Sequence, residues 1–380
     1  MVWHGQELPF DLAQVLLCPA VFYRRILILM VVPGHFNSVR HTLAPSCAGS
    51  CAGGGPNKFQ IAIPELPIDR SKLPQQIFEE CDLLEGDKNI RGDNSQLLQV
   101  IDQVDAIIFN SSNDINAELM QSAPKLKIAF KSGARPENID YTYAKSHGIA
   151  VGWTPAANAQ SVAEYTILLM MSALRNITQA ERILAQGGWR NQCGLGHDIC
   201  GLTVGLVGLG GIGCHVAAML KGFQANVIAF DPYTPDSTFE KNGVLRVTLD
   251  DLLTQADIVS IHCLLTNETR NIFNHSVFSR MKPNAILVNS ARRGMIDEAA
   301  LFDALQSHQI AGAALDVYAS EPPAPDHPFR SLNNIIMTPH IAARTEEASW
   351  RECTWAIQGA LDYLNGRPIE NAVVITPEKN

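Results

Sequence analysis

Three polar residues that could work together in catalysis follow short apolar runs in the last quarter of the chain. Arg292, Glu321 and His340 each lie at or just after the end of a predicted strand. Ligands bind at the carboxyl edge of an open parallel sheet, so these side chains are expected to converge there. An arginine can bind a carboxylate through two parallel hydrogen bonds, and a histidine beside a carboxylate can transfer protons. Taken singly, each has a plainer interpretation as a surface Arg, a loop Glu or a strand-end His, and only the ordered set favours a catalytic site.

A glycine-rich motif separates an apolar strand from an apolar helix near the middle of the chain. Gly208, Gly210 and Gly213 form the pattern G-x-G-x-x-G. The first glycine permits a tight turn, the second lets a pyrophosphate approach the backbone, and the third lets the helix and strand pack closely. The phosphates would lie at the helix N-terminus, where free N–H groups favour negative charge.

The next predicted strand ends at Asp231, eighteen residues after Gly213. A carboxylate at this place can accept both hydroxyls of an adenine ribose and repels a 2′-phosphate. The order of strand, loop, helix, strand and acid therefore predicts a dinucleotide site. NAD is favoured over NADP, because no Arg follows Asp231 in Pro-Tyr-Thr-Pro.

Two series of short strands alternating with helices are expected to position these residues. The first series has strands Phe59 to Ile63, Asp105 to Phe109, Leu126 to Phe130 and Ile149 to Trp153, with helical stretches such as Leu97 to Val104 and Ala117 to Ser122. The second has strands Thr203 to Val207, Val227 to Phe230, Ile258 to His262, Ile286 to Asn289, Ala311 to Val317 and Ile335 to Met337. Such alternation predicts an α/β protein with two doubly wound parallel sheets covered by helices.

Two longer helices and a distinct beginning complete the predicted organisation. Apolar residues recur at helical spacing from Val162 to Ile183, which predicts one long helix bridging two domains, and Glu346 to Leu364 forms a final helix. Residues 1–57, which include an Ala/Gly/Cys-rich stretch, are predicted to be a poorly ordered extension. We therefore expect a substrate domain at 58–157 and 344–380 and a nucleotide domain at 158–343.

Composition excludes several classes of protein. The 380 residues, 46% hydrophobic and 18% charged, are enough for two or three domains with real cores. A net charge of −9 without a basic cluster argues against nucleic acid as a partner. The apolar stretch from Leu12 to Val32 is interrupted by Pro19, Arg24 and Arg25, so no membrane span is expected.

The nine cysteines indicate a reducing compartment. They are scattered, odd in number and never spaced C-x-x-C. A disulfide framework or a zinc site would need a more regular arrangement. We therefore expect reduced thiols in a cytoplasmic protein and no metal site.

From about residue 58 to residue 375 the chain resembles the D-isomer-specific 2-hydroxyacid dehydrogenase family, which includes D-3-phosphoglycerate dehydrogenase, hydroxypyruvate reductase and D-lactate dehydrogenase. The motifs that carry the resemblance are Asn158-Ala-Gln-Ser-Val-Ala-Glu, Val207-Gly-Leu-Gly-Gly-Ile-Gly, His262-Cys-Leu-Leu-Thr, Asn289-Ser-Ala-Arg, Ala314-Leu-Asp-Val, Glu321-Pro and Thr338-Pro-His-Ile. The resemblance implies a Rossmann NAD-binding domain inserted into a flavodoxin-like substrate domain. It also implies a homodimer.

The resemblance implies a role for each of the three catalytic candidates. Arg292 would bind the substrate carboxylate and polarise the neighbouring carbonyl. His340 would give a proton to that oxygen during reduction, or take it during oxidation, while hydride passes between the substrate and the nicotinamide. Glu321 would fix the imidazole tautomer and favour the imidazolium. The implied reaction interconverts a small D-2-hydroxy acid and its 2-oxo acid with NAD.

Further positions match binding residues of the family. Cofactor contacts are implied for Gly208, Gly210, Gly211, Ile212, Gly213, Asp231, Cys263, Thr266, Ser290, Ala291 and Asp316. Substrate contacts are implied for Ser132, Gly133 and Ala134, in a loop that resembles the one whose backbone N–H groups receive the substrate carboxylate, and for Arg292. A plain turn after a strand remains an alternative for that loop.

The chain also departs from the family pattern. Arg135 and Arg293 replace usual glycines and Leu264 replaces a common proline. Asn110-Ser111 stands where phosphoglycerate enzymes tend to carry Arg-Ser, which argues against a phosphorylated substrate. An alternative function is an NAD(H)-sensing, corepressor-like binding protein of the same fold, because fold alone does not determine function.

Overall fold

Two mostly parallel sheets, with helices on their faces, make up residues 58–64, 69–86 and 94–377, the part of the chain that this computed structural model describes. The predicted α/β fold is confirmed. The expected extension, 1–57, lies outside the described residues. The predicted domain boundaries at 157/158 and 343/344 stay predictions.

The first sheet has six strands in the order β13-β5-β4-β3-β1-β2. Its strands are β1 (Phe59–Ile63), β2 (Cys81–Glu85), β3 (Ala106–Phe109), β4 (Ile128–Lys131), β5 (Ala150–Trp153) and β13 (Val373–Ile375). The five parallel strands follow the flavodoxin-like order 2-1-3-4-5. Strand β13 pairs antiparallel to β5 at the edge.

Alternate residues of the first sheet point into two separate cores. On one face, Ile61, Ile108 and Phe130 pack with α12 (Glu346–Leu364). On the other, Ile107 packs with the remaining helices of this part of the chain. These are α2 (Ser95–Leu98), η2 (Ile101–Gln103), α3 (Ala117–Gln121) and α4 (Tyr141–Ser146), while η1 (Arg70–Lys72) and α1 (Ile77–Glu80) lie before β2.

The second sheet has seven strands in the order β12-β11-β10-β9-β6-β7-β8. Its strands are β6 (Thr203–Val207), β7 (Asn226–Phe230), β8 (Leu245–Arg246), β9 (Ile258–Ile261), β10 (Ile286–Asn289), β11 (Gly312–Leu315) and β12 (Ile335–Met337). Numbered along the chain, the first six strands follow the Rossmann order 3-2-1-4-5-6. All of its pairings are parallel.

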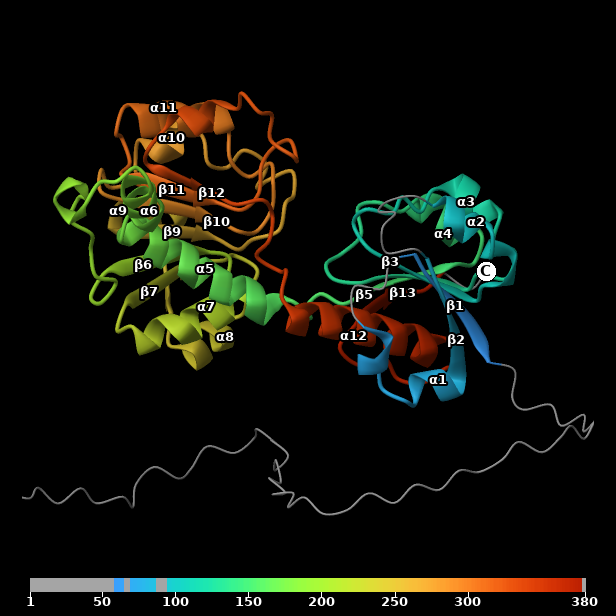
Figure 1. Ribbon diagram of the computed structural model, residues 1–380. Helices are drawn as coiled ribbons and strands as arrows, with labels where there is room; N and C mark the ends of the chain where they lie inside the picture. Colours follow the sequence, from blue (N-terminus) through green and yellow to red (C-terminus); the bar gives the residue numbers. More distant parts are fainter. Residues whose placement is uncertain (1–57, 65–68, 87–93, 378–380) are drawn as a thin grey trace, which may run out of the picture. The chain divides into compact units, whose positions relative to one another are not determined.

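Helices cover both faces of the second sheet, as Figure 1 shows. One face carries α5 (Ala159–Leu174), α7 (Gly211–Gly222) and α8 (Asp236–Asn242), and the other carries α9 (Leu249–Gln255), α10 (His275–Phe278) and α11 (Glu298–Gln306). Val288 points to the first set and its neighbour Leu287 to the second, as the two-residue period of a strand requires.

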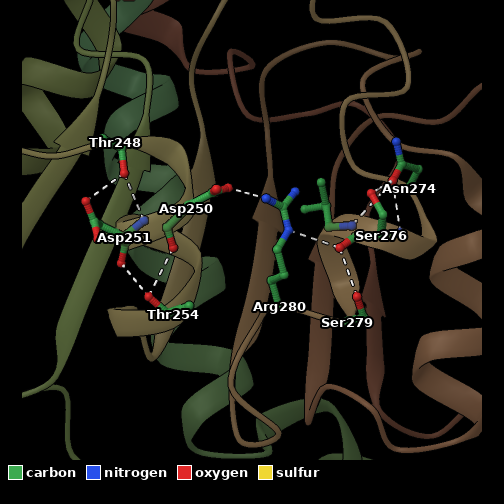
Figure 2. A network of polar contacts seen from close by, with 9 residues as sticks. Thr248, Asp250, Asp251, Thr254, Asn274, Ser276, Ser279 and Arg280 are labelled. Carbon is green, nitrogen blue, oxygen red and sulfur yellow. Dashed lines mark hydrogen bonds and ion pairs between the residues drawn. The ribbon is translucent and has the colours of Figure 1, made fainter.

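A polar network ties α9 to the segment around α10 (Figure 2). Thr248 accepts a hydrogen bond from the Asp251 N–H at 3.1 Å and so caps the N-terminus of α9. Arg280 pairs with Asp250 and donates to the Ser276 carbonyl at 3.1 Å. These contacts link α9 to the C-terminal end of α10, and both helices pack on the same face of the sheet.

The predicted long helix is wrong in one respect, because it is broken in two. α5 ends at Leu174, and α6 (Ile177–Ala185) begins after Asn176, which has a left-handed φ of 51°. That backbone conformation cannot continue a right-handed helix. Apolar residues keep their helical spacing on both sides of Asn176, so the sequence gives no sign of the break. The segment after α6 contains η3 (Arg190–Gln192), and η4 (Pro328–Ser331) precedes β12.

Three strands were also missed. β2 and β13 are edge strands of the first sheet and β8 is an edge strand of the second. Edge strands face solvent, so they lack the continuous apolar runs of buried parallel strands. Across the described residues, no helix is both long enough and apolar enough to span a bilayer.

Candidate active site

His340 and Glu321 lie within hydrogen-bond distance, with 2.8 Å between Nδ1 and Oε2. The His340 side chain is 54% exposed and the Glu321 side chain 24% exposed. The other Glu321 oxygen accepts a hydrogen bond from the Tyr318 N–H at 3.1 Å. Because Nδ1 is held by the carboxylate, Nε2 is the nitrogen left to exchange a proton with a substrate.

Asp316 holds the segment that carries His340. Its carboxylate is fully buried and accepts hydrogen bonds from the Thr338 hydroxyl at 2.6 Å and from the N–H groups of Ile341 and Ala342 at 3.0 and 2.8 Å. His340 itself has a positive φ of 55°, a conformation that non-glycine residues adopt only when the surroundings impose it. Asp316 has no exposed surface in this structure. Its predicted contact with the cofactor stays a prediction.

The turn after β10 positions Arg292. The Asn289 side chain donates to the Arg292 carbonyl at 3.1 Å and accepts from the Ala291 N–H at 3.0 Å. The guanidinium donates to the Ala291 carbonyl at 2.9 Å and is partly exposed, which leaves most of its donors available. Ser290 is buried and its hydroxyl lies 2.6 Å from that of Thr166 on α5.

The glycine loop between β6 and α7 fits a bound pyrophosphate. Gly208 has a φ of 104°, and a Cβ there would lie 2.6 Å from the Cys263 nitrogen. A Cβ on Gly213 would lie 2.5 Å from the Gly208 carbonyl oxygen. A Cβ on Gly210 would meet nothing within 4 Å, and Gly210 is exposed at the N-terminus of the twelve-residue helix α7. Internal packing thus explains the outer two glycines, and the middle one leaves open space suited to a phosphate.

Asp231 follows β7 as predicted, and protein donors already occupy its carboxylate. Oδ2 accepts from the Leu209 N–H and the Thr234 hydroxyl, both at 2.9 Å, and Oδ1 accepts from the N–H groups of Tyr233 and Thr234 at 3.0 and 3.1 Å. Burial raises the pKa of this carboxyl, but the hydrogen bonds outweigh it and the pKa is lowered. The acid is thus held ionised beside the glycine loop.

Sequence inspection missed an arginine beside Asp231. Arg246, from β8, donates to the Asp231 carbonyl at 2.9 Å and pairs with Asp236 at 2.8 Å. Its guanidinium also stacks over the Phe239 ring, 4.0 Å from the centroid. Arg246 lies fifteen positions after Asp231 in the chain, so the residues that directly follow Asp231 do not reveal it.

The other predicted cofactor residues line the same sheet edge in different ways. The Cys263 thiol faces the Met295 sulfur at 3.8 Å, and burial raises its pKa to about 11. The exposed Thr266 hydroxyl caps its own turn by accepting from the Glu268 N–H at 3.2 Å. Gly211 is exposed, and Ile212 packs partly on the core beneath α7. Their contacts with a cofactor stay predictions.

The loop after β4 is less open than expected. The Ser132 N–H donates to the Phe109 carbonyl, and the Gly133 N–H donates to the Thr154 hydroxyl, at 2.9 and 2.7 Å. Within the described residues, the Ala134 N–H is the one of the three without a protein acceptor. Of the three N–H groups expected to receive a carboxylate, only that of Ala134 is therefore available for it.

Two charged residues that the motifs did not identify stand beside this loop. Lys131, at the end of β4, is only 7% exposed, and Glu352 comes from α12. Burial lowers the pKa of the Lys131 ammonium, and the positive charge of Arg292 lowers it further. The closeness of a lysine at the end of a strand to an acid more than two hundred positions away in the chain has no signal in the sequence.

Comparison with known proteins matches this site to a family. Residues 167–342 match the model described as D-isomer specific 2-hydroxyacid dehydrogenase, NAD binding domain. The chain is 38% identical to the D-3-phosphoglycerate dehydrogenase of Archaeoglobus fulgidus over 278 residues, which are 73% of this chain and 53% of that protein. It thus spans about half the length of that relative.

Two further relatives are covered more completely. The hydroxypyruvate reductase of Thermotoga maritima is 38% identical over 261 residues, which are 68% of this chain and 84% of that protein. The solved structure of the pyruvate reductase of Chlamydomonas reinhardtii superposes with a TM-score of 0.71 at 30% identity, covering 82% of this chain and 98% of the other. The chain belongs to the D-isomer-specific 2-hydroxyacid dehydrogenase family, and it carries that family's NAD-binding domain.

Proposed function

We propose that the protein interconverts a small D-2-hydroxy acid and its 2-oxo acid with NAD. The single observation that carries this proposal is the 2.8 Å pair between His340 and Glu321, which stands at the same sheet edge as Arg292 and the glycine loop. NAD supplies the hydride acceptor, and NADH the donor, for the C2 carbon of the substrate. Every other part of the reaction belongs to side-chain and backbone groups of this chain.

Each of these groups has a defined task. Arg292 binds the substrate carboxylate with its planar fork and draws electron density from the C2 oxygen. The Ala134 N–H is a second donor for the same carboxylate. His340 gives the Nε2 proton to the C2 oxygen during reduction, and the Glu321 carboxylate stabilises the imidazolium that precedes this transfer. Asp316 keeps the His340 segment in place throughout.

The test is a spectrophotometric screen of NADH oxidation with glyoxylate, hydroxypyruvate, pyruvate, 2-oxoglutarate and phosphohydroxypyruvate. We expect turnover with at least one unphosphorylated acid, because an asparagine, Asn110, stands where phosphoglycerate enzymes tend to carry Arg. A purified protein that turns over none of the five, but self-associates when NADH is added, would instead support the corepressor-like alternative. No feature of the described residues favours that second function.

We further propose that a second copy of the chain covers the segment 168–195. Five of the large exposed apolar side chains lie there, and α6 buries none of its own residues. They are Leu168, Ile177, Leu184, Trp189 and Leu195, of which Trp189 is 66% and Leu195 95% exposed. A patch of this kind on a stable protein is typical of an interface. Sedimentation of the Leu184→Asp variant should show a monomer where the wild type sediments as a dimer, and a monomeric wild type would refute the proposal.

The thiols support a reducing compartment, and we propose the cytoplasm. The six cysteines within the described residues are all free. Four of their thiols have a raised pKa, with burial as the first cause, which keeps them protonated and unreactive. Fractionation of cells that express the chain with a small tag would test this location.

A further inference from the structure

Glu352, on α12, lies against residues 132–134, here called the substrate loop, and also contacts the start of α5. Its Oε1 accepts a hydrogen bond from Asn158 Nδ2 at 2.7 Å, just before α5. The same oxygen would be 3.1 Å from a Cβ on Gly133, so the carboxylate packs directly on the loop beside Ala134. An ionisable group in this place is part of the surroundings of any anion bound there.

Lys131 and Arg292 are the cations that share these surroundings. Lys131 is buried at the base of the loop, and Arg292 approaches from the second sheet closely enough to lower the pKa of the lysine. Glu352 acts in the opposite sense on Lys131. Burial raises the pKa of Glu352, and the hydrogen bond from Asn158 and the charges of Lys131 and Arg351 offset this rise only in part. Glu137 also faces Lys131 but is exposed, so water screens its charge.

The Arg351 guanidinium donates to the Ala157 carbonyl and the Ser161 hydroxyl. The charges that act on Lys131 at the base of the loop, apart from the exposed Glu137, are those of Arg292 and Glu352, so this group of three adds to one positive charge when Glu352 is ionised. Two cations and one carboxylate balance a substrate with a single negative charge. If the carboxylate were neutral, the two cations would balance a dianion. Charges that are shielded from water interact several times more strongly than charges at the surface, so this difference is large enough to select between substrates.

We propose that Glu352 is a specificity-determining residue that restricts the site to monoanionic 2-oxo acids and excludes those with a second anionic group. It acts by offsetting the charge of Lys131 beside the loop that receives the substrate. This inference deepens the proposed function and rests on it for the identity of the reaction. It adds a substrate class that the family motifs do not specify.

The test compares two small anions of nearly the same shape and different charge. Oxamate carries one negative charge at neutral pH and oxalate carries two. Calorimetry with the full chain and saturating NADH gives the ratio of their dissociation constants. We expect the wild type to bind oxamate more tightly, and Glu352→Gln to shift the ratio toward oxalate by about tenfold or more. Lys131→Met should shift the ratio in the opposite direction.

The control is Glu347→Gln, which removes the same charge from an exposed position on the same helix and should leave the ratio unchanged. A purely structural role of Glu352 would weaken both anions alike, so an unchanged ratio in Glu352→Gln overturns the proposal. Failure of the wild type to bind either anion overturns it as well. If Glu352→Gln shows the charge-dependent shift but the wild type reduces no 2-oxo acid, the proposed function is refuted and this inference stands.

Discussion

The carboxylate of Asp316 holds the backbone N–H of Ile341, the residue after His340, with 3.0 Å between Oδ1 and the nitrogen. Asp316 follows β11, and His340 follows β12, the neighbouring strand. A buried acid at the end of one strand therefore fixes the backbone from which the His340 imidazole projects at the end of the next. The positive φ of His340 persists because this contact and its neighbours impose it.

Replacing Asp316 with Asn should lower both activity and stability. An amide offers one acceptor oxygen, so its NH₂ group would face an N–H donor of residue 341 or 342 and leave it unpaired. We expect a loss of about 1–3 kcal/mol in the free energy of unfolding. Loosening of the His340 segment should also lower kcat by about tenfold or more. Urea unfolding and steady-state kinetics would check this, with Asp303→Asn, at an exposed position of α11, as the control. A fully active Asp316→Asn would contradict the prediction.

Removal of the imidazole should abolish most of the activity and leave cofactor binding intact. His340→Ala is expected to lower kcat by about 10²–10⁴-fold, because general acid catalysis is lost. Glu321→Gln should cause a smaller loss, since the imidazole remains but its imidazolium loses the 2.8 Å partner. Fluorescence titration should give an NADH dissociation constant close to that of the wild type for both. A His340→Ala enzyme with an unchanged rate would remove His340 from the mechanism.

Two glycines of the same loop should respond differently to alanine. Gly208→Ala should prevent stable folding, because its Cβ would overlap the Cys263 backbone and its φ of 104° disfavours a side chain. Gly210→Ala should fold with nearly the wild-type melting temperature, because its Cβ would meet nothing within 4 Å. We expect the second variant to bind NADH about tenfold or more weakly, as the methyl group would fill the space for the pyrophosphate. Normal NADH affinity in Gly210→Ala would be evidence against this loop as the cofactor site.

Asp231 should determine the choice between NADH and NADPH. Its ionised carboxylate repels a 2′-phosphate, and Arg246 lies beside its backbone. Asp231→Ala removes the repulsion and leaves the arginine in place. The ratio of kcat/KM for NADPH to that for NADH should rise by about tenfold to a hundredfold. Asp231→Ala, Arg246→Ala should reverse part of this gain, and an unchanged ratio in the single variant would show that selectivity lies elsewhere.

Stability should fall between pH 6.5 and pH 4 because of His262. This imidazole is buried, its Nε2 lies 2.9 Å from the Ser260 hydroxyl, and burial lowers its pKa from 6.5 to about 4. In that window the unfolded chain binds a proton at His262 that the folded chain does not. The contribution of His262 to the free energy of unfolding is therefore complete above pH 6.5 and is lost as the pH falls toward 4. The contribution amounts to at most about 3 kcal/mol.

The measurement is urea unfolding at a series of pH values for the wild type and His262→Gln. The glutamine is neutral at every pH, so the difference between the two proteins should change across the window and be constant above it. Parallel pH profiles would mean that the folded protein protonates His262 as readily as the unfolded chain does.

The elements that position the candidate site residues could be predicted because their sequence signals are local. Strands such as Ile286–Asn289 are continuous apolar runs that only a buried parallel strand explains, and a glycine pattern reports the turn that follows β6. The end of α12 at Leu364 and its start at Glu346 were also predictable, since Thr345 caps the first turn. The break at Asn176 was not, because apolar spacing continues across it.

The sequence by itself determined the fold class, the order of the candidate site residues along the chain and the class of cofactor, since these depend on periodicity, on glycine geometry and on residue type. Tertiary structure alone decided which groups are free to act. It showed that the Gly133 N–H is occupied by Thr154, and that Arg246 stands beside Asp231. It also placed Glu352 on the substrate loop. Each of these contacts joins residues far apart in the chain, and hydrogen bonding and charge balance between such residues exist only after the sheets and helices have packed.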